Sequence, residues 1–325
     1  MVASQALISA WYSLTQQLMN LGYVPRLSVR HTSSHEEGQI YVPKVNTALM
    51  FGCLALVVWF GSSSALAAAY GLSVTGTMAV TTILFYFVAR TLWRWGRPQA
   101  LTVCGVFLIA ELALLGANLP KVFHGGWVPL AVGALLYLLM STWRRGRLLL
   151  GAYFQRSALD IDLFLADIAS RNPPRVHGTA IFFSKEPTGV PHVLLHHLKH
   201  CEVLHDRVVL LSILTDRVPE VPRGREVETI DLGQGFYRMT LRHGFRQSPN
   251  VTRALAAMTL GDLPVNLAKT SFYFGRETIL ATGRGAMAVW RKELFSVMAR
   301  NAKPATAYFG IPPNRVVELG TQIAL

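Results

Sequence analysis

One carboxylate lies inside an apolar stretch of the chain. Glu111 is the one charged residue between Pro98 and Pro120. A carboxylate within a membrane is energetically costly, which favours a functional or paired role, and such a group could exchange protons. A purely structural role, as a hydrogen-bond partner of a neighbouring helix, stays open beside the functional one.

A row of histidines forms a second candidate. His192, His196 and His200 are spaced four residues apart, so they would share one face of a helix, with His205 nearby. Imidazoles ligate metals, but acidic or cysteine partners at ligand spacing are missing, apart from Cys201. We expect no metal site here, and we expect this histidine face to pack on a sheet or on a partner domain.

The sequence shows no catalytic apparatus. Gly233-Gln-Gly235 lacks the third glycine and the following helix of a phosphate-binding loop. Ser184 and Ser212 have no evident histidine and aspartate around them. We therefore expect neither an enzyme nor a bound cofactor.

The charges divide the chain into two regimes. Only 15% of the residues are charged, against roughly 25% in an average soluble protein, and none is charged in 45–89 or 122–143. A membrane-spanning helix needs about 20 mainly apolar residues. We predict four spans, near 46–61, 66–89, 99–118 and 126–143, with the first two separated at Gly61-Ser-Ser-Ser64. Residues 1–45 are expected to hold the end of a truncated span, or else an interfacial helix, and a cytoplasmic loop.

Basic residues predict the orientation of these spans. They gather before the first span, after the second and after the fourth, at Arg26, Arg30, Lys44, Arg90, Arg94, Arg97, Arg144, Arg145 and Arg147. The two other loops hold only Lys121. Since short cytoplasmic loops are enriched in lysine and arginine, we expect a multi-pass protein of the cell inner membrane with a cytoplasmic C-terminus. The net charge of +13 then indicates contact with the lipid bilayer rather than with nucleic acid.

Residues 150–325 predict a cytoplasmic α/β domain with a mixed sheet. The apolar run Val208–Leu214 is typical of a buried parallel strand, and Glu226–Asp231 with Phe236–Leu241 indicates a hairpin. Further strands are expected at Thr179–Ser184, Thr270–Phe274 and Thr278–Leu280, and helices at Leu159–Ser170, Val190–Cys201, Val251–Thr259 and Trp290–Asn301.

Several ordered blocks carry a family resemblance. They are Gly38-Gln-Ile-Tyr-Val-Pro43, Ala67-Ala-Ala-Tyr-Gly71, His124-Gly-Gly-Trp127, His197-Leu-Lys-His200 and the segment from Ile311 to Gln322. Together they resemble the Kup/HAK/KT family of bacterial and plant potassium uptake permeases. Members of that family are about twice as long and begin with seven further spans. The chain therefore resembles the C-terminal half of such a permease.

The resemblance implies a fold and an activity. The family is similar to the amino-acid/polyamine/organocation (APC) superfamily, in which inverted repeats enclose an ion site near the midplane. It implies potassium uptake coupled to proton entry, with K⁺ and H⁺ as the transported ions. The family's main ion-coordinating spans have no counterpart here, so this chain is not expected to hold potassium alone.

Four residues remain as ion-pathway candidates: Tyr70, Thr75, Thr77 and Glu111. The alternative is that the small and hydroxyl-bearing residues serve close helix packing. As partners, the resemblance implies a second copy bound through the cytoplasmic domain, and a separately encoded N-terminal half. The rival interpretation is a non-transporting membrane subunit, or a membrane-anchored regulatory or signalling domain.

Overall fold

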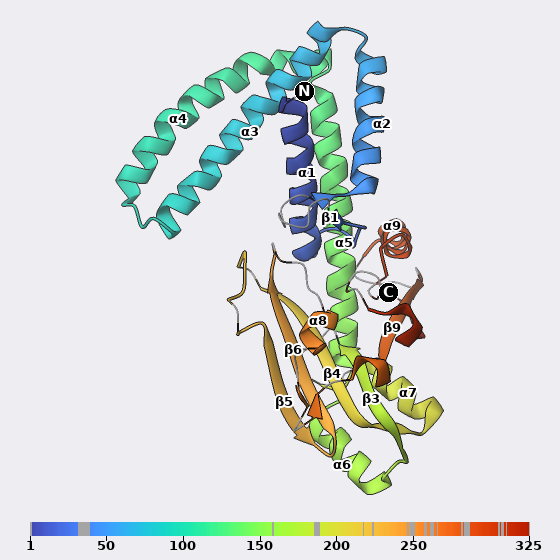
Figure 1. Cartoon of the computed structure of the whole chain (residues 1–325). Helices are drawn as coiled ribbons and strands as arrows, with labels where there is room; N and C mark the ends of the chain where they lie inside the picture. The colour runs from blue at the N-terminus through green and yellow to red at the C-terminus, as the bar shows by residue number, and fades with distance from the viewer. Residues whose placement is uncertain are drawn as a thin grey trace. The chain divides into compact units, whose positions relative to one another are not determined.

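The structure is a computed structural model in which the chain forms two compact units (Figure 1). It describes residues 2–31, 40–157, 159–184, 189–216, 218–222, 224–245, 247, 251–256, 259–260, 263–264, 266–280, 282, 287–304, 306, 309 and 311–324. The helical unit is Val45–Leu139, and the sheet unit combines Met1–Lys44 with Met140–Leu325. Each unit is described by itself below.

The helical unit consists of long apolar helices. They are α2 (Pro43–Phe60), α3 (Ser63–Thr91), α4 (Arg97–Asn118), the 3₁₀ helix η1 (Leu119–His124) and the first part of α5 (Trp127–Arg156). Glycines break them: Gly61 separates α2 from α3 at φ +61°, and Gly125 ends η1 at φ +110°. Both are left-handed conformations that glycine adopts without a steric penalty.

Four of the described helices are long and apolar enough to cross a membrane, as the sequence predicts. A break occurs within the predicted segment 61–64 but is shorter, because α2 ends at Phe60 and α3 already begins at Ser63. The fourth helix is longer than expected, since α5 continues past residue 143 to Arg156. Arginine and leucine are good helix formers, so the end of the apolar stretch does not end the helix.

The N-terminal residues form a helix and a short hairpin in the sheet unit. Helix α1 (Val2–Asn20) is followed by β1 (Arg30–His31) and β2 (Ile40–Tyr41), which pair antiparallel. Tyr12 of α1 packs edge-on against Tyr41 with ring centroids 5.7 Å apart. Most of the loop before β2, including Gly38 of the family-like block, lies outside the described residues. Whether α1 belongs to a span or lies at the interface stays a prediction.

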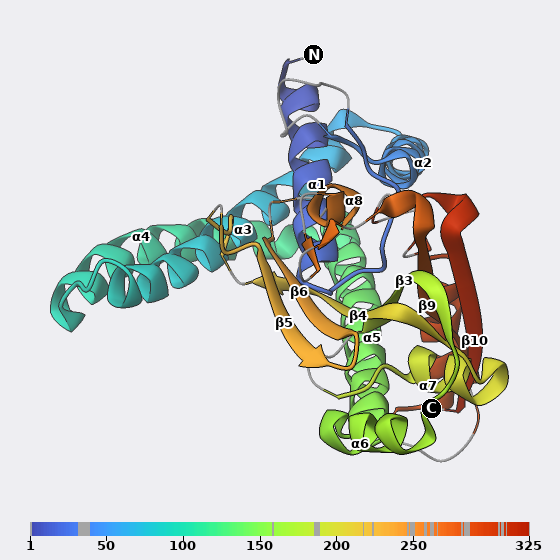
Figure 2. The same cartoon turned by 60° about the horizontal axis from the view of Figure 1, so that its bottom comes forward.

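A six-stranded mixed sheet forms the centre of the sheet unit (Figure 2). Its order is β10 (Val316–Ala324), β9 (Thr270–Leu280), β3 (Arg175–Ser184), β4 (Leu204–Asp216), β6 (Phe236–Gly244) and β5 (Val227–Gly233). All neighbouring pairs are parallel except β5 with β6, which form the predicted hairpin. The predicted α/β character and mixed sheet are thus confirmed.

Helices cover the two faces of this sheet. On one face, α6 (Ile161–Arg171) and α7 (His192–Cys201) bury Phe164, Ile168 and Leu194 against Phe182 and Leu210. Helix α6 begins where the Asp160 carboxylate accepts hydrogen bonds from two backbone amides of the first turn. On the other face, α8 (Val251–Ala256) packs on the strands. Residues 257 and 258 of the predicted longer helix lie outside the described residues, and Thr259 belongs to a strand.

The C-terminal strands differ from the prediction. One continuous strand, β9, replaces the two short strands expected at 270–274 and 278–280. Between these two predicted strands, β9 continues through 275–277 and pairs there with β10, where Arg276 and Glu318 form an ion pair. Strand β10 itself was not predicted.

The remaining described elements are short or lie near the C-terminus. Helix α9 spans Val289–Arg300, one residue off the predicted start. The short elements are β7 (Thr259–Leu260), β8 (Leu263–Pro264), η2 (Leu267–Lys269) and η3 (Pro313–Arg315).

Candidate functional site

Helices α3 and α4 lie side by side in the helical unit and pack closely against each other (Figures 1 and 2). Small residues such as Ala79 and Ala89 of α3 and Ala100 of α4 are buried in this unit. A Cβ atom built at Gly71 would lie 3.1 Å from Oδ1 of Asn118, so glycine permits close approach there. Small residues of this kind let membrane helices pack without a hydrophobic driving force.

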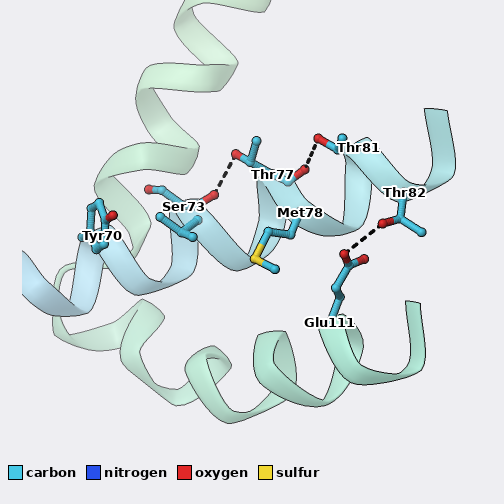
Figure 3. A pocket seen from close by; sticks show the side chains of 8 residues that line it. Tyr70, Ser73, Thr77, Met78, Thr81, Thr82 and Glu111 are labelled. Carbon is cyan, nitrogen blue, oxygen red and sulfur yellow. Dashed lines mark hydrogen bonds between the residues drawn. The ribbon is translucent and has the colours of Figure 1, made fainter. Parts of the chain in front are cut away.

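An open pocket of about 420 Å³ runs along α3, and its lining is mainly apolar with several hydroxyl groups (Figure 3). Most of its lining comes from α3, and Glu111 of α4 closes one end. The α3 residues are Tyr70, Ser73, Val74, Thr77, Met78, Thr81 and Thr82. Five of these seven side chains carry a hydroxyl group.

Three of the hydroxyl groups form a regular row. Ser73 Oγ donates to the Ala69 carbonyl at 2.9 Å, and Thr77 Oγ1 donates to the Ser73 carbonyl at 2.8 Å. Thr81 Oγ1 donates to the Thr77 carbonyl at 2.8 Å (Figure 3). Each bond joins a hydroxyl to the carbonyl one turn earlier, an arrangement that keeps the side chain against its own helix.

Glu111 reaches from α4 to Thr82 of α3, the residue after the last member of this row. Its Oε1 accepts a hydrogen bond from Thr82 Oγ1 at 2.8 Å, as Figure 3 shows. The residue is only 8% exposed. Its second oxygen, Oε2, is buried and has no hydrogen-bond partner among the described residues. An acceptor left in this state costs about 1–3 kcal/mol, and more if it is charged.

The structure brings three of the four predicted residues to this pocket. Tyr70, Thr77 and Glu111 line it, whereas Thr75 is buried away from it and donates to the Gly71 and Leu72 carbonyls. The roles of all four residues stay predictions.

Sequence reasoning missed Ser73, Thr81 and Thr82. The signal was the spacing of Ser73, Thr77 and Thr81, which recurs every four residues and therefore defines one helix stripe.

The predicted histidine face is not the face of α7 that packs on the sheet. His200 is exposed and His192 contacts Ser157, whereas His197 is buried against Phe182 and Tyr273. The expectation that His192, His196 and His200 pack on the sheet is therefore wrong, whereas packing of this face on a partner domain stays a prediction. The apolar residues of the helix decide its orientation. Within the described ranges, no three histidine, cysteine or acidic side chains lie where one metal ion could bind them all.

The sheet unit also contains two buried histidines, His197 and His243, and a partly buried one, His205. Burial lowers the pKa of His197 and of His205, whose rings lie 6.4 Å apart between centroids. Burial also lowers the pKa of His243, on β6, to about 4. Nε2 of His243 lies 3.0 Å from the Thr215 hydroxyl, and its Nδ1 is buried without a partner among the described residues. Burial thus disfavours the charged form of all three imidazoles.

Comparisons with known proteins match both parts of the chain. Residues 1–148 match the model of the K⁺ potassium transporter integral membrane domain. Residues 177–325 match the model of the K⁺ potassium transporter C-terminal domain.

Curated relatives match along the whole chain. A "Probable potassium transport system protein Kup" from Anaeromyxobacter sp. (strain Fw109-5) is 52% identical over 329 residues, covering 100% of this chain and 50% of the relative. A protein of the same name from Myxococcus xanthus is 50% identical, again over 100% of this chain and 50% of the relative. "Probable potassium transport system protein Kup 2" from Syntrophobacter fumaroxidans is 48% identical, over 100% and 51%. The chain thus spans about half the length of these relatives.

These matches correct one prediction. The chain was expected to be the C-terminal half of a permease, but models of both the integral membrane domain and the C-terminal domain fall on it. We therefore do not retain the assignment to one half. With its four candidate spans and its mixed-sheet domain, the chain is an integral membrane relative of the K⁺ potassium transporters.

Proposed function

We propose that this chain takes part in potassium uptake across a membrane, by symport of K⁺ with H⁺. The observation that carries the proposal is its similarity, over its whole length, to potassium transport system proteins. The pocket on α3 adds support, because hydroxyl oxygens and a buried carboxylate, which an ion pathway needs, are among its lining groups. Glu111 is the acidic residue within a candidate span that would exchange the proton.

We further propose that the helices belong to an inverted-repeat fold of the APC type, in the inner membrane, with the sheet domain in the cytoplasm. The arginine clusters that follow α3 and lie within α5 support this orientation. The sheet domain would then regulate transport or join two copies of the chain.

A second candidate is a subunit whose ion pathway is completed by a partner. The relatives are about twice as long as this chain, and the candidate spans bury only 0–22% of their most apolar windows within the structure. Helices of a packed membrane bundle bury more of their surface against one another. The partner would be a separately encoded protein that supplies further membrane helices.

Rubidium uptake distinguishes a chain that transports alone from a subunit that needs a partner. Potassium-starved cells would express the chain alone, or together with a candidate partner, and ⁸⁶Rb⁺ entry would be measured beside growth on low potassium. Uptake by the chain alone is expected if it forms a complete pathway. Uptake only with the partner would support the subunit. Absence of uptake in both, with the proteins present in the membrane, would refute the transport proposal.

A further inference from the structure

Two basic residues border uncharged stretches of the chain. Lys44 is the last charged residue before the stretch 45–89, and Arg144 is the first charged residue after the stretch 122–143. The apolar parts of the four candidate spans lie between them, and an even number of crossings brings both residues to the same side of a membrane. Lysine and arginine at the ends of spanning helices extend toward the lipid headgroups. Lys44 and Arg144 are therefore expected at the level of the headgroups.

Hydrogen bonds within the sheet unit bring the C-terminal end of α9 to these residues. Lys44 Nζ donates to the Asn301 carbonyl at 3.0 Å, and the Lys303 backbone amide donates to the Arg26 carbonyl at 2.7 Å. Arg300 lies in the last turn of α9, and its side chain is exposed. Residues that are distant from the spans in the sequence thus join a surface at the level of the headgroups. We call Lys44, Arg144, Arg300 and Lys303 the basic cluster.

The charge of this surface is almost entirely positive. Its segments 20–31, 40–44, 140–147 and 289–304 carry ten lysine or arginine residues and one acidic residue, Glu293. In the described part of the chain, no side chain of the basic cluster pairs with a carboxylate. Elsewhere in the same unit, Arg171, Arg242 and Arg276 each do so. The basic cluster therefore offers positive charge that the described residues do not neutralise.

Neutral partners hold two of these side chains in place while leaving them charged. The Arg144 guanidinium lies over the Tyr23 ring, 4.8 Å from its centroid, and donates to the Tyr23 hydroxyl at 2.6 Å. The Lys44 ammonium is held by the Asn301 carbonyl. Since a guanidinium has five N–H donors and an ammonium three, most of these donors remain for a ligand. Donors of this kind bind phosphate, which arginine contacts through two parallel hydrogen bonds.

We propose that the basic cluster binds the phosphate of anionic phospholipid headgroups, and that the end of α9 thereby attaches the sheet unit to the membrane surface. The connection of Lys44 and Arg144 to the spans favours a lipid over a soluble phosphate, because it keeps them close to the headgroups. Each lysine or arginine near an anionic bilayer strengthens binding about fivefold. A zwitterionic headgroup adds a positive charge of its own, so it fits the cluster less well. The proposal concerns membrane attachment and does not depend on transport.

Lipid-dependent stability of the full-length chain tests the proposal. The chain, purified in a nonionic detergent, would be titrated with short-chain phosphatidylglycerol or phosphatidylcholine, and thermal unfolding would be followed at constant ionic strength. A ligand that binds only the folded state raises the unfolding midpoint as its concentration increases. We expect a larger rise with phosphatidylglycerol than with phosphatidylcholine, and we expect this difference to shrink at high salt, which screens exposed charges.

Matched double variants locate the effect, each compared with its own midpoint without lipid. Arg300→Gln with Lys303→Gln removes two charges from the part of the cluster that is distant from the spans in the sequence. It should need roughly 25-fold more phosphatidylglycerol for the same rise. Arg171→Gln with Arg276→Gln removes the same charge at exposed, paired positions elsewhere in the unit and should respond like the wild type. Arg300→Lys with Lys303→Arg keeps both charges and should also keep the response.

Several results would overturn the proposal. Equal rises with phosphatidylglycerol and phosphatidylcholine would show that the phosphate charge is not recognised. An equal loss in the variants at Arg300 and Lys303 and at Arg171 and Arg276 would assign the effect to net charge rather than to this surface. A full response in Arg300→Gln with Lys303→Gln would exclude the end of α9. If inorganic phosphate at the same concentration reproduced the rise, the ligand would be a soluble anion and not a lipid.

Discussion

A glycine on α5 allows α9 to pack against it within the sheet unit. Phe295 of α9 is buried, and its ring centroid lies 5.3 Å from that of Trp143 on α5. A Cβ atom built at Gly146 would lie 2.5 Å from Cγ and Cδ2 of Phe295. These atoms belong to the base and edge of a buried ring, so they cannot move aside as the tip of a flexible side chain would. We predict that Gly146→Ala separates the two helices.

The expected change in the stability of Gly146→Ala is the sum of two opposing effects. Alanine improves a helix interior over glycine by about 1 kcal/mol. Forcing one extra carbon into a packed core costs typically about 1–3 kcal/mol. Gly151, on the same helix, has no atom within 4 Å of a built Cβ, so Gly151→Ala should show the favourable effect alone. Because the propensity gain cancels between the two variants, Gly146→Ala should be less stable than Gly151→Ala by about 1–3 kcal/mol.

Thermal unfolding of the full-length chain in detergent measures this difference at one fixed scan rate. Each kcal/mol corresponds to about 2–4 °C in a domain of 150–250 residues. Gly146→Ala combined with Phe295→Leu should recover part of the loss, since the smaller side chain leaves room for the new methyl group. Equal midpoints for Gly146→Ala and Gly151→Ala would refute the packing argument.

Three further predictions concern other parts of the chain. Because burial lowers the pKa of His243 from 6.5 to about 4, the unfolded chain binds a proton that the folded chain does not. The contribution of neutral His243 to stability is therefore fully present above pH 6.5, and about 3 kcal/mol of it is lost as the pH falls to 4. In His243→Gln, the unfolding midpoint should change less with pH across this range than in the wild type. His200→Gln, at an exposed histidine, should leave the pH dependence unchanged. Arg291→Ala removes hydrogen bonds of 3.0 and 3.1 Å to two hydroxyl groups of α5, and should lower the unfolding midpoint by the equivalent of about 1–3 kcal/mol. Thr82→Val should destabilise the chain because it leaves the Glu111 carboxylate without its donor, and Thr82→Val with Glu111→Leu should restore the midpoint.

Much of the fold was predictable because charge and turn-forming residues leave strong local signals. The absence of charge between Val45 and Ala89, interrupted by Gly61 and the serines after it, predicts two apolar helices. Strand β4 was predicted from an uninterrupted apolar run, since both of its faces are covered.

The elements that sequence reasoning missed depend on partners distant in the chain. Strand β10 alternates exposed and partly buried residues weakly, and it is fixed by its parallel pairing with β9 along its whole length. The orientation of α7 was also misjudged, because four-residue spacing drew attention to His192, His196 and His200. The buried position belongs to His197, next to Val193 and Leu194, which belong to the core under the sheet.

The candidate site shows where sequence patterns stop being informative. Thr75 and Thr77 have the same chemistry, lie on the same helix and donate to the same kind of carbonyl. They differ by two residues, or about 200° around the helix. Only the packing of the unit decides which of these directions is buried and which faces the pocket. Among the hydroxyl groups that line the pocket, Thr82 is the one that donates to Glu111, which lies at that end of the pocket. The stripe of Ser73, Thr77 and Thr81 becomes visible only when the four-residue spacing is considered as a whole.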